Sequence, residues 1–247
     1  MEQGLRITTA SSARKAMELI ESRHFDVVVS DYQMPRMDGI ELLKLLRSKR
    51  INVPFVLFTG WGREDVAIAA LNNGADYNIQ KGGEPVAQFA ELRNAIMHSI
   101  HRKSAEELAQ GIVDNAPLMI MIVEEDRRIQ TFNRAVLEFT GMTAREVIGL
   151  RCGLAFNCGN ARQNELGCGF SSGCDDCKLW GAVKRTIETG EKCLRVRAVI
   201  PIPEGKGDGK MILMVSTAPI RTYRKDLALV FLKDLTEFRK EGRVEID

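Results

Sequence analysis

Three side chains that could take part in phosphoryl chemistry follow three separate apolar runs of this 247-residue chain. Asp31 ends the run 25–31, Thr59 ends the run 53–59, and Lys81 follows a third run that starts at Tyr77. Each run has the length of a strand and is bounded by turn residues, which predicts a buried strand. Because ligands of open α/β sheets bind at the carboxyl ends of parallel strands, we expect the three groups to meet there. A carboxylate in such a place can act as a nucleophile, and an ammonium group can pair with a phosphoryl oxygen.

Each of these residues also has an ordinary explanation. A strand can end in Asp31 with no further role, Thr59 is an unremarkable residue at the end of a strand, and Lys81 suits a solvated loop. The three together, at the ends of three predicted strands, favour a shared site over coincidence.

Helical patterns separate the predicted strands. A further short strand is predicted over 6–9, and helices are predicted over 13–22, 40–48, 65–73 and 85–102. Ser11 or Ser12 can cap the first helix, and Pro85 suits the first turn of the last one. Strands that alternate with helices predict a parallel, doubly wound sheet with helices on both faces.

The stretch 25–39, with its Met-Pro-Arg-Met-Asp-Gly ending, resembles the phosphoacceptor loop of the response-regulator receiver family. The resemblance implies a flavodoxin-like α/β fold, which we expect over residues 1–103. It also implies that Asp31 accepts a phosphoryl group from a partner sensor histidine kinase.

The same resemblance assigns roles to four further residues. Thr59 becomes the switch hydroxyl, and Lys81 pairs with a phosphoryl oxygen. Gly60 leaves room for the phosphoryl group, and the backbone carbonyl of Gln33 helps to hold Mg²⁺.

The chain departs from the family pattern in ways that weaken this site. Family receivers begin with a strand that ends in an acidic pair that binds Mg²⁺, and we expect that strand, the first helix and the pair to be absent here. A misplaced start, a truncated gene or a receiver that phosphorylates poorly would each explain this. Asn78 replaces an aromatic residue found in many members, and Gly82 follows Lys81 in place of a proline, as in archaeal receivers.

The second half of the chain has a different pattern. A helix continues through 96–110, followed by a hairpin that turns at 125–126, helical pieces from Asn133, a helix over 179–189 and strands over 193–202, 211–220 and 227–233. This order resembles a PAS domain over residues 104–240, with a tail at 241–247. The resemblance implies an α+β fold with an antiparallel five-stranded sheet, and a sensory or dimerisation role. Histidine-ligated haem is not expected, because all three histidines precede this domain.

Six cysteines fall between positions 152 and 193. In a chain without a secretory signal, such clustering favours metal or redox chemistry over a disulfide framework. Four of them suit a Zn²⁺ ion or an iron–sulfur cluster by their spacing, namely Cys158, Cys168, Cys174 and Cys177. Cys152 and Cys193 are expected outside this set. The glycine-rich insertion over about 152–178 resembles a pattern in PAS domains of anaerobes, which implies redox or metal sensing. A reversible disulfide and inert reduced thiols are the alternatives.

Composition narrows the possible partners. The 35 basic and 33 acidic residues leave a net charge of +2, which gives no broad field for nucleic acid or a membrane surface. No apolar run reaches the ~18 residues of a membrane span. We therefore expect a cytoplasmic protein.

These observations together predict a two-component signal transduction protein. We expect no catalytic activity of its own, a homodimer formed through the PAS domain or the receiver, and output by protein–protein contact. The alternatives are a fragment or front part of a hybrid histidine kinase, and a metal-sensing or redox-sensing PAS module with a degenerate receiver.

Overall fold

The computed structural model describes residues 4–60, 64–203, 209–223 and 225–236. The chain forms two compact units, Met1–Ala109 and Gln110–Asp247. They divide within helix α4 (Pro85–Asp114), a few residues beyond the boundary predicted between 103 and 104. The predicted tail over 241–247 lies outside the described residues.

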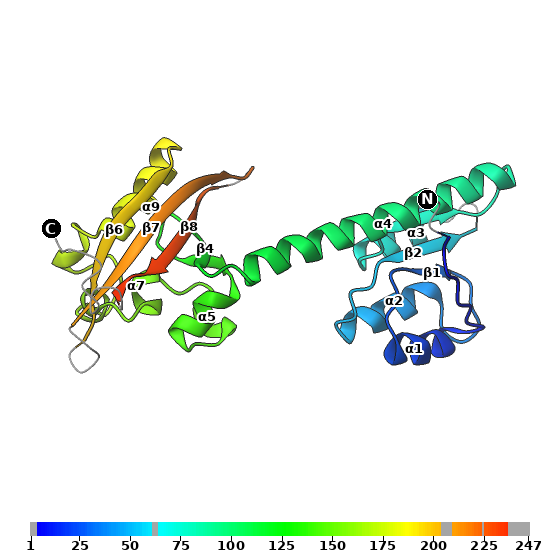
Figure 1. Ribbon diagram of the computed structural model, residues 1–247. Helices are drawn as coiled ribbons and strands as arrows, with labels where there is room; N and C mark the ends of the chain where they lie inside the picture. The colour runs from blue at the N-terminus through cyan, green and yellow to red at the C-terminus, as the bar shows by residue number, and fades with distance from the viewer. Residues whose placement is uncertain (1–3, 61–63, 204–208, 224, 237–247) are drawn as a thin grey trace. The chain divides into compact units, whose positions relative to one another are not determined.

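The first unit contains a parallel sheet of three strands in the order β1-β2-β3 (Figure 1). The strands are β1 (Val28–Asp31), β2 (Phe55–Thr59) and β3 (Tyr77–Gln80). Asp31 lies opposite Phe58 in the register, and Thr59 lies opposite Gln80. The carboxyl ends of all three strands therefore meet at one edge of the sheet, as predicted.

Residues 6–9 form no strand, so that prediction is wrong. Leu5 is 46% exposed and Ile7 is 78% exposed, so neither side chain is held against a sheet. Within the described residues β1 hydrogen-bonds to β2 alone. An extended segment becomes a strand only where a neighbouring strand completes its hydrogen bonds, and here residues 6–9 do not reach one.

Helices cover both faces of this sheet, which confirms the doubly wound architecture (Figure 1). Helices α1 (Ala13–Ser22), α2 (Gly39–Ser48) and α3 (Glu64–Asn72) share a core with Phe55 and Leu57 of β2. Val56 and Ile79 point to the opposite face and pack with Ala95 of α4. The apolar run of β2 is thus continuous because both of its faces are buried.

The helix starts follow local capping chemistry. The Ser12 hydroxyl accepts a hydrogen bond from the Lys15 N–H, which confirms the predicted cap of α1. Asp38 and Glu41 form a reciprocal capping box at the start of α2. This box fixes the turn that carries the chain from Asp31 into α2.

Gly39 lies tightly packed in that turn. A Cβ atom at this position would lie 2.5 Å from the Asp31 carbonyl oxygen and 2.6 Å from Leu57 Cδ1. A Gly39→Ala substitution is therefore expected to lower the free energy of unfolding by about 1–3 kcal/mol, as overpacking does elsewhere. Urea unfolding followed by circular dichroism measures this. In α4, Gly111→Ala meets no atom within 4 Å and should raise helix stability, so equal effects of the two substitutions would contradict the prediction.

The second unit is built on a five-stranded antiparallel sheet in the order β5-β4-β8-β7-β6, as the PAS resemblance implies (Figure 1). The strands are β4 (Met119–Val123), β5 (Ile129–Phe132), β6 (Cys193–Pro201), β7 (Lys210–Arg221) and β8 (Asp226–Asp234). The predicted hairpin at 125–126 and the three predicted late strands are confirmed.

Helix α9 (Lys178–Thr189) packs on this sheet through Leu179 and Val183. Inside the interface the hydroxyls of Thr186 and Thr217 lie 2.6 Å apart, so each satisfies the other where water is excluded. The remaining helices are α5 (Arg134–Thr140), α6 (Ala144–Val147), α7 (Cys152–Ala155), α8 (Gly159–Arg162) and the short 3₁₀ turn η1 (Ser172–Cys174). Across the part of the chain that the structure describes, each helix is too short or too polar to cross a membrane.

Candidate functional site

The carboxyl edge of the first sheet holds an ion pair between two of the predicted site residues. Asp31 ends β1, and Lys81 follows β3 directly, on the other side of β2. The Lys81 Nζ atom lies 2.5 Å from Asp31 Oδ2, and about 40% of each side chain is exposed (41% and 39%). The geometry therefore presents a carboxylate and an ammonium group together at a solvent-accessible edge.

Backbone contacts hold both members of this pair. The Asp31 Oδ1 atom accepts a hydrogen bond from the Gln33 N–H at 3.2 Å. The Lys81 N–H donates to the Thr59 carbonyl at 2.5 Å, which extends the β2–β3 pairing by one residue. The Lys81 ammonium also lies 5.6 Å from the centre of the Phe58 ring. The position of each charged group is thus set by the strand ends themselves.

Two further predicted residues, Thr59 and Gly60, lie at the end of β2. Thr59 is fully buried, and its hydroxyl donates to the Ile79 carbonyl at 3.5 Å, toward the neighbouring strand. A Cβ atom on Gly60 would meet nothing within 4 Å, so open space lies beside this residue. On β3 the amide oxygen of Asn78 is buried without a hydrogen-bond partner in the described part of the chain.

The oxygen donors at this edge suit a weakly held divalent cation. Mg²⁺ in phosphoryl sites takes one or two carboxylates and completes its shell with water and phosphate oxygens. The Asp31 carboxylate supplies one protein donor, and the Gln33 N–H donates to its Oδ1 atom. Within the described residues no group of three acidic, histidine or cysteine side chains is placed to hold a metal ion. The donor set therefore fits Mg²⁺ only with a phosphoryl group and water as further ligands.

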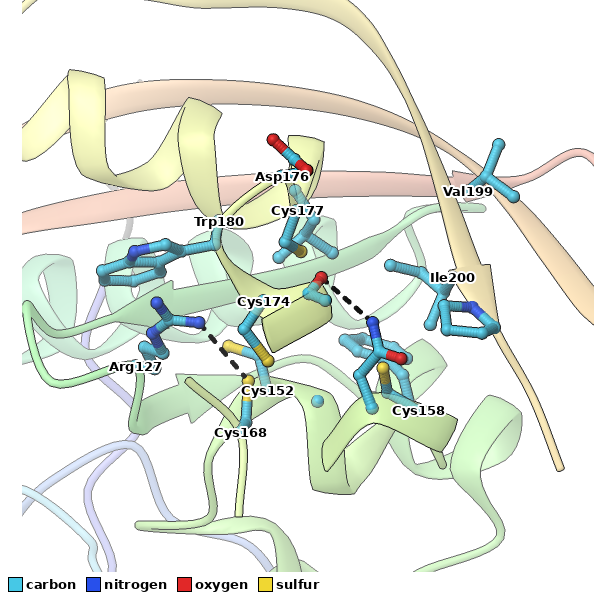
Figure 2. A pocket seen from close by; sticks show the side chains of 16 residues that line it. Arg127, Cys152, Cys158, Cys168, Cys174, Asp176, Cys177, Trp180, Val199 and Ile200 are labelled. Carbon is cyan, nitrogen blue, oxygen red and sulfur yellow. Dashed lines mark hydrogen bonds between the residues drawn. The ribbon is translucent and has the colours of Figure 1, made fainter. Parts of the chain in front are cut away.

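Five cysteines of the second unit line one cavity of about 80 Å³, which we call the thiol pocket (Figure 2). They are Cys152, Cys158, Cys168, Cys174 and Cys177. The structure thus brings the four predicted ligands together and adds Cys152, which was predicted to lie outside. The backbone N–H of Cys152 donates to the Arg127 carbonyl, and this hydrogen bond holds Cys152 beside the turn that borders the pocket. Cys193 lies elsewhere, against the Thr186 hydroxyl.

Short helices and one glycine position these thiols. Cys152 starts α7, while Cys158 and Cys177 are the cap residues of α8 and α9. A Cβ atom on Gly153 would lie 2.7 Å from Cys168 Sγ, so only glycine lets the two segments come this close.

The thiols differ in acidity. Burial raises the pKa of Cys152, Cys158 and Cys177, and nearby thiols add to the rise. Burial also acts on Cys174, but hydrogen bonds from the Ser171 hydroxyl and the Gly169 N–H outweigh it, so the pKa of Cys174 lies below its ordinary value. Each described cysteine is a free thiol.

Arg127 and Trp180 also line the thiol pocket, and neither was predicted. The Arg127 guanidinium lies 4.4 Å over the Trp180 ring and donates to Cys168 Sγ at 3.9 Å. Neither residue belongs to a local motif with the cysteines, since Arg127 is in the β4–β5 turn and Trp180 is in α9. Spacing along the chain carries no signal for a contact of this kind.

Comparisons with known proteins agree with the division into two parts. Residues 1–96 match the family model described as a response regulator receiver domain, and residues 117–237 match a PAS domain model. Regulatory protein AtoC of Escherichia coli is 31% identical over 145 residues, which cover 55% of this chain and 31% of AtoC. Response regulator SaeR of Staphylococcus aureus is 28% identical over 109 residues, which cover 43% of this chain and 47% of SaeR.

The chain thus spans less than half the length of these curated relatives. Among solved structures, the receiver domain of the Francisella response regulator 1452 is 31% identical, with 39% of this chain and 76% of that chain covered and a TM-score of 0.36.

Proposed function

This chain combines a response regulator receiver domain with a PAS domain, and we propose from that premise that it is a two-component signalling protein which accepts a phosphoryl group on Asp31. The observation that carries the proposal is the Asp31–Lys81 ion pair at the carboxyl edge of the sheet. Receiver domains of response regulators interact with sensor histidine kinases, so the proposed donor is a phosphohistidine of such a kinase. The proposed role is signalling, with no catalytic activity beyond the acceptor's own phosphorylation.

In the proposed reaction a carboxylate oxygen of Asp31 bonds to phosphorus while the bond from phosphorus to the donor nitrogen breaks. The Lys81 ammonium neutralises charge on the phosphoryl oxygens, which is the main requirement of phosphoryl transfer. The Thr59 hydroxyl then leaves the Ile79 carbonyl and donates to a phosphoryl oxygen. Mg²⁺, held by the Asp31 carboxylate and the Gln33 carbonyl, would supply further positive charge when bound.

The PAS unit provides the proposed sensory or dimerisation module. Output would run through protein–protein contact, with a homodimer formed by the PAS unit or the receiver and with no nucleic acid or membrane partner. We also propose a cytoplasmic location, where the clustered cysteines would be kept as reduced thiols.

Incubation of the full chain with acetyl phosphate and Mg²⁺ tests the proposal. The wild-type chain is expected to take up one phosphoryl group as an acyl phosphate. A Lys81→Ala variant loses the ammonium group beside the acceptor, so its labelling rate is expected to fall by about 10²-fold. Intact-mass spectrometry over time measures both rates.

Lys49→Ala serves as the matched control. Lys49 also pairs with a carboxylate, at 2.6 Å from Glu21 Oε1, but it lies on the far end of α2 from the site. Labelling of this variant should follow the wild type. A wild-type chain that stays unlabelled, or a Lys81→Ala variant that labels as fast as Lys49→Ala, would count against the proposed site.

A further inference from the structure

The thiol pocket contains more sulfur than a single disulfide needs. Five thiols face one cavity, and Asp176 is the one carboxylate residue in its lining. No histidine takes part, since all three histidines belong to the first unit. Sulfur ligands without nitrogen select soft metals, above all zinc, copper(I) and iron–sulfur clusters.

The size of the cavity favours an iron–sulfur cluster over a single metal ion. A tetrahedral Zn²⁺ site needs each sulfur within about 2.3 Å of one point, which leaves no empty space between the ligands. In the described residues no three cysteines approach each other in that way. About 80 Å³ of space stands between the thiols instead. A centre made of several irons and sulfides would occupy this space while its ligands stay apart.

Hydrogen-bond donors face the sulfurs in the way that an anionic cluster requires. Arg127 donates to Cys168 Sγ at 3.9 Å (Figure 2). The Gly169 N–H donates to Cys174 Sγ at 3.3 Å. Donors to the ligating sulfurs stabilise the negative charge of such clusters and tune their potentials.

The secondary structure around the pocket also favours a bound metal cluster. The segment from 152 to 177 contains α7, α8 and η1, which are each three or four residues long. Helices of this length have little stability of their own. Four of its five cysteines are nonetheless buried and Cys177 is partly buried, and metal binding is a common way to stabilise a chain of this kind.

We propose that the thiol pocket binds an iron–sulfur cluster through Cys158, Cys168, Cys174 and Cys177, with Cys152 beside the cluster as an additional thiol. On assembly each of the four ligating thiols releases a proton and its sulfur bonds to iron; the iron enters as ferrous and ferric ions together and the bridging sulfur as sulfide, so no further oxidant is consumed. The proposal is independent of Asp31, because the pocket lies in the second unit.

Anaerobic reconstitution of the full chain with ferrous and ferric iron and sulfide tests this directly. The wild-type protein is expected to retain iron and acid-labile sulfide in equal amounts after desalting, and to absorb visible light. Each of the substitutions Cys158→Ser, Cys168→Ser, Cys174→Ser and Cys177→Ser is expected to cause loss of most of the bound iron and sulfide. Far-UV circular dichroism of each variant reports whether the second unit is still folded.

Two other cysteines serve as matched controls. Cys193→Ser removes a buried thiol outside the pocket, and Cys152→Ser removes one inside it that is not a proposed ligand; both variants should keep the cluster. Loss of iron from Cys152→Ser would overturn the ligand assignment.

Three results on the wild-type chain would contradict cluster binding, regardless of the results for the variants. They are absence of acid-labile sulfide after reconstitution, tight binding of one Zn²⁺ in its place, and a disulfide between pocket cysteines in the protein isolated without oxygen. None of these results would change the phosphoryl labelling expected at Asp31, because Asp31 lies in the first unit.

Discussion

Replacement of Asp31 by asparagine is expected to abolish covalent phosphorylation of this chain. The amide is close to the carboxylate in shape, so the turn into α2 should persist. It is a much weaker nucleophile, however, and it carries no charge to hold the Lys81 ammonium at the sheet edge. Phosphoryl uptake from acetyl phosphate, measured by intact-mass spectrometry, should fall to the background level.

Asp26→Asn is the control for this experiment. Asp26 is an exposed carboxylate shortly before β1, and it should be replaceable without effect on labelling. Peptide mapping of the Asp31→Asn variant is also informative, because it shows whether another carboxylate accepts the phosphoryl group. Persistent acyl phosphate in Asp31→Asn at the wild-type level would refute Asp31 as the acceptor.

Replacement of Asn133 by alanine is expected to cost the second unit about 3 kcal/mol of unfolding free energy. Asn133 is 1% exposed. Its Oδ1 accepts from the Ile120 N–H at 2.9 Å, and its Nδ2 donates to the carbonyls of Val113 and Leu118 at 2.8 and 2.9 Å. One side chain thus satisfies three backbone groups that join the end of α4 to β4. Alanine would leave all three without this partner where water has little access.

Urea unfolding of the full chain measures this loss, with Trp61→Phe introduced in every sample so that the fluorescence reports Trp180 in α9. Asn115→Ala is the comparison, because Asn115 is exposed and its side chain makes a single bond, to the Gly111 carbonyl. Its effect should stay within about 0.5 kcal/mol, as is usual for surface positions. The role assigned to Asn133 fails if both variants unfold at the same urea concentration.

Local patterns along the sequence were enough to place most elements. The apolar run of β2 predicts a strand buried on both faces, and Ser12 predicts the start of α1 through one hydrogen bond. The hairpin at 125–126 and the start of the helical region at Asn133 follow in the same way. Each of these features depends on residues within a few positions of one another, so periodicity and capping rules suffice.

The predictions that failed concern contacts between distant segments. Residues 6–9 have the composition of a strand but pair with no strand among the residues that the structure describes. Cys152 was excluded from the cysteine set by spacing alone, yet the chain folds back so that it lines the same cavity as Cys177. In both cases the deciding fact was the position of another segment, which composition does not specify.

The sequence by itself determined the two fold classes, the strand ends that carry Asp31, Thr59 and Lys81, and the clustering of the cysteines. Only the tertiary structure decided that Lys81 reaches the Asp31 carboxylate while the Thr59 hydroxyl turns to Ile79. It also decided that Arg127 and five thiols enclose a single cavity. The reason is physical: secondary structure depends on short-range sterics and hydrogen bonds, whereas the distance between two side chains far apart in sequence depends on how whole elements pack.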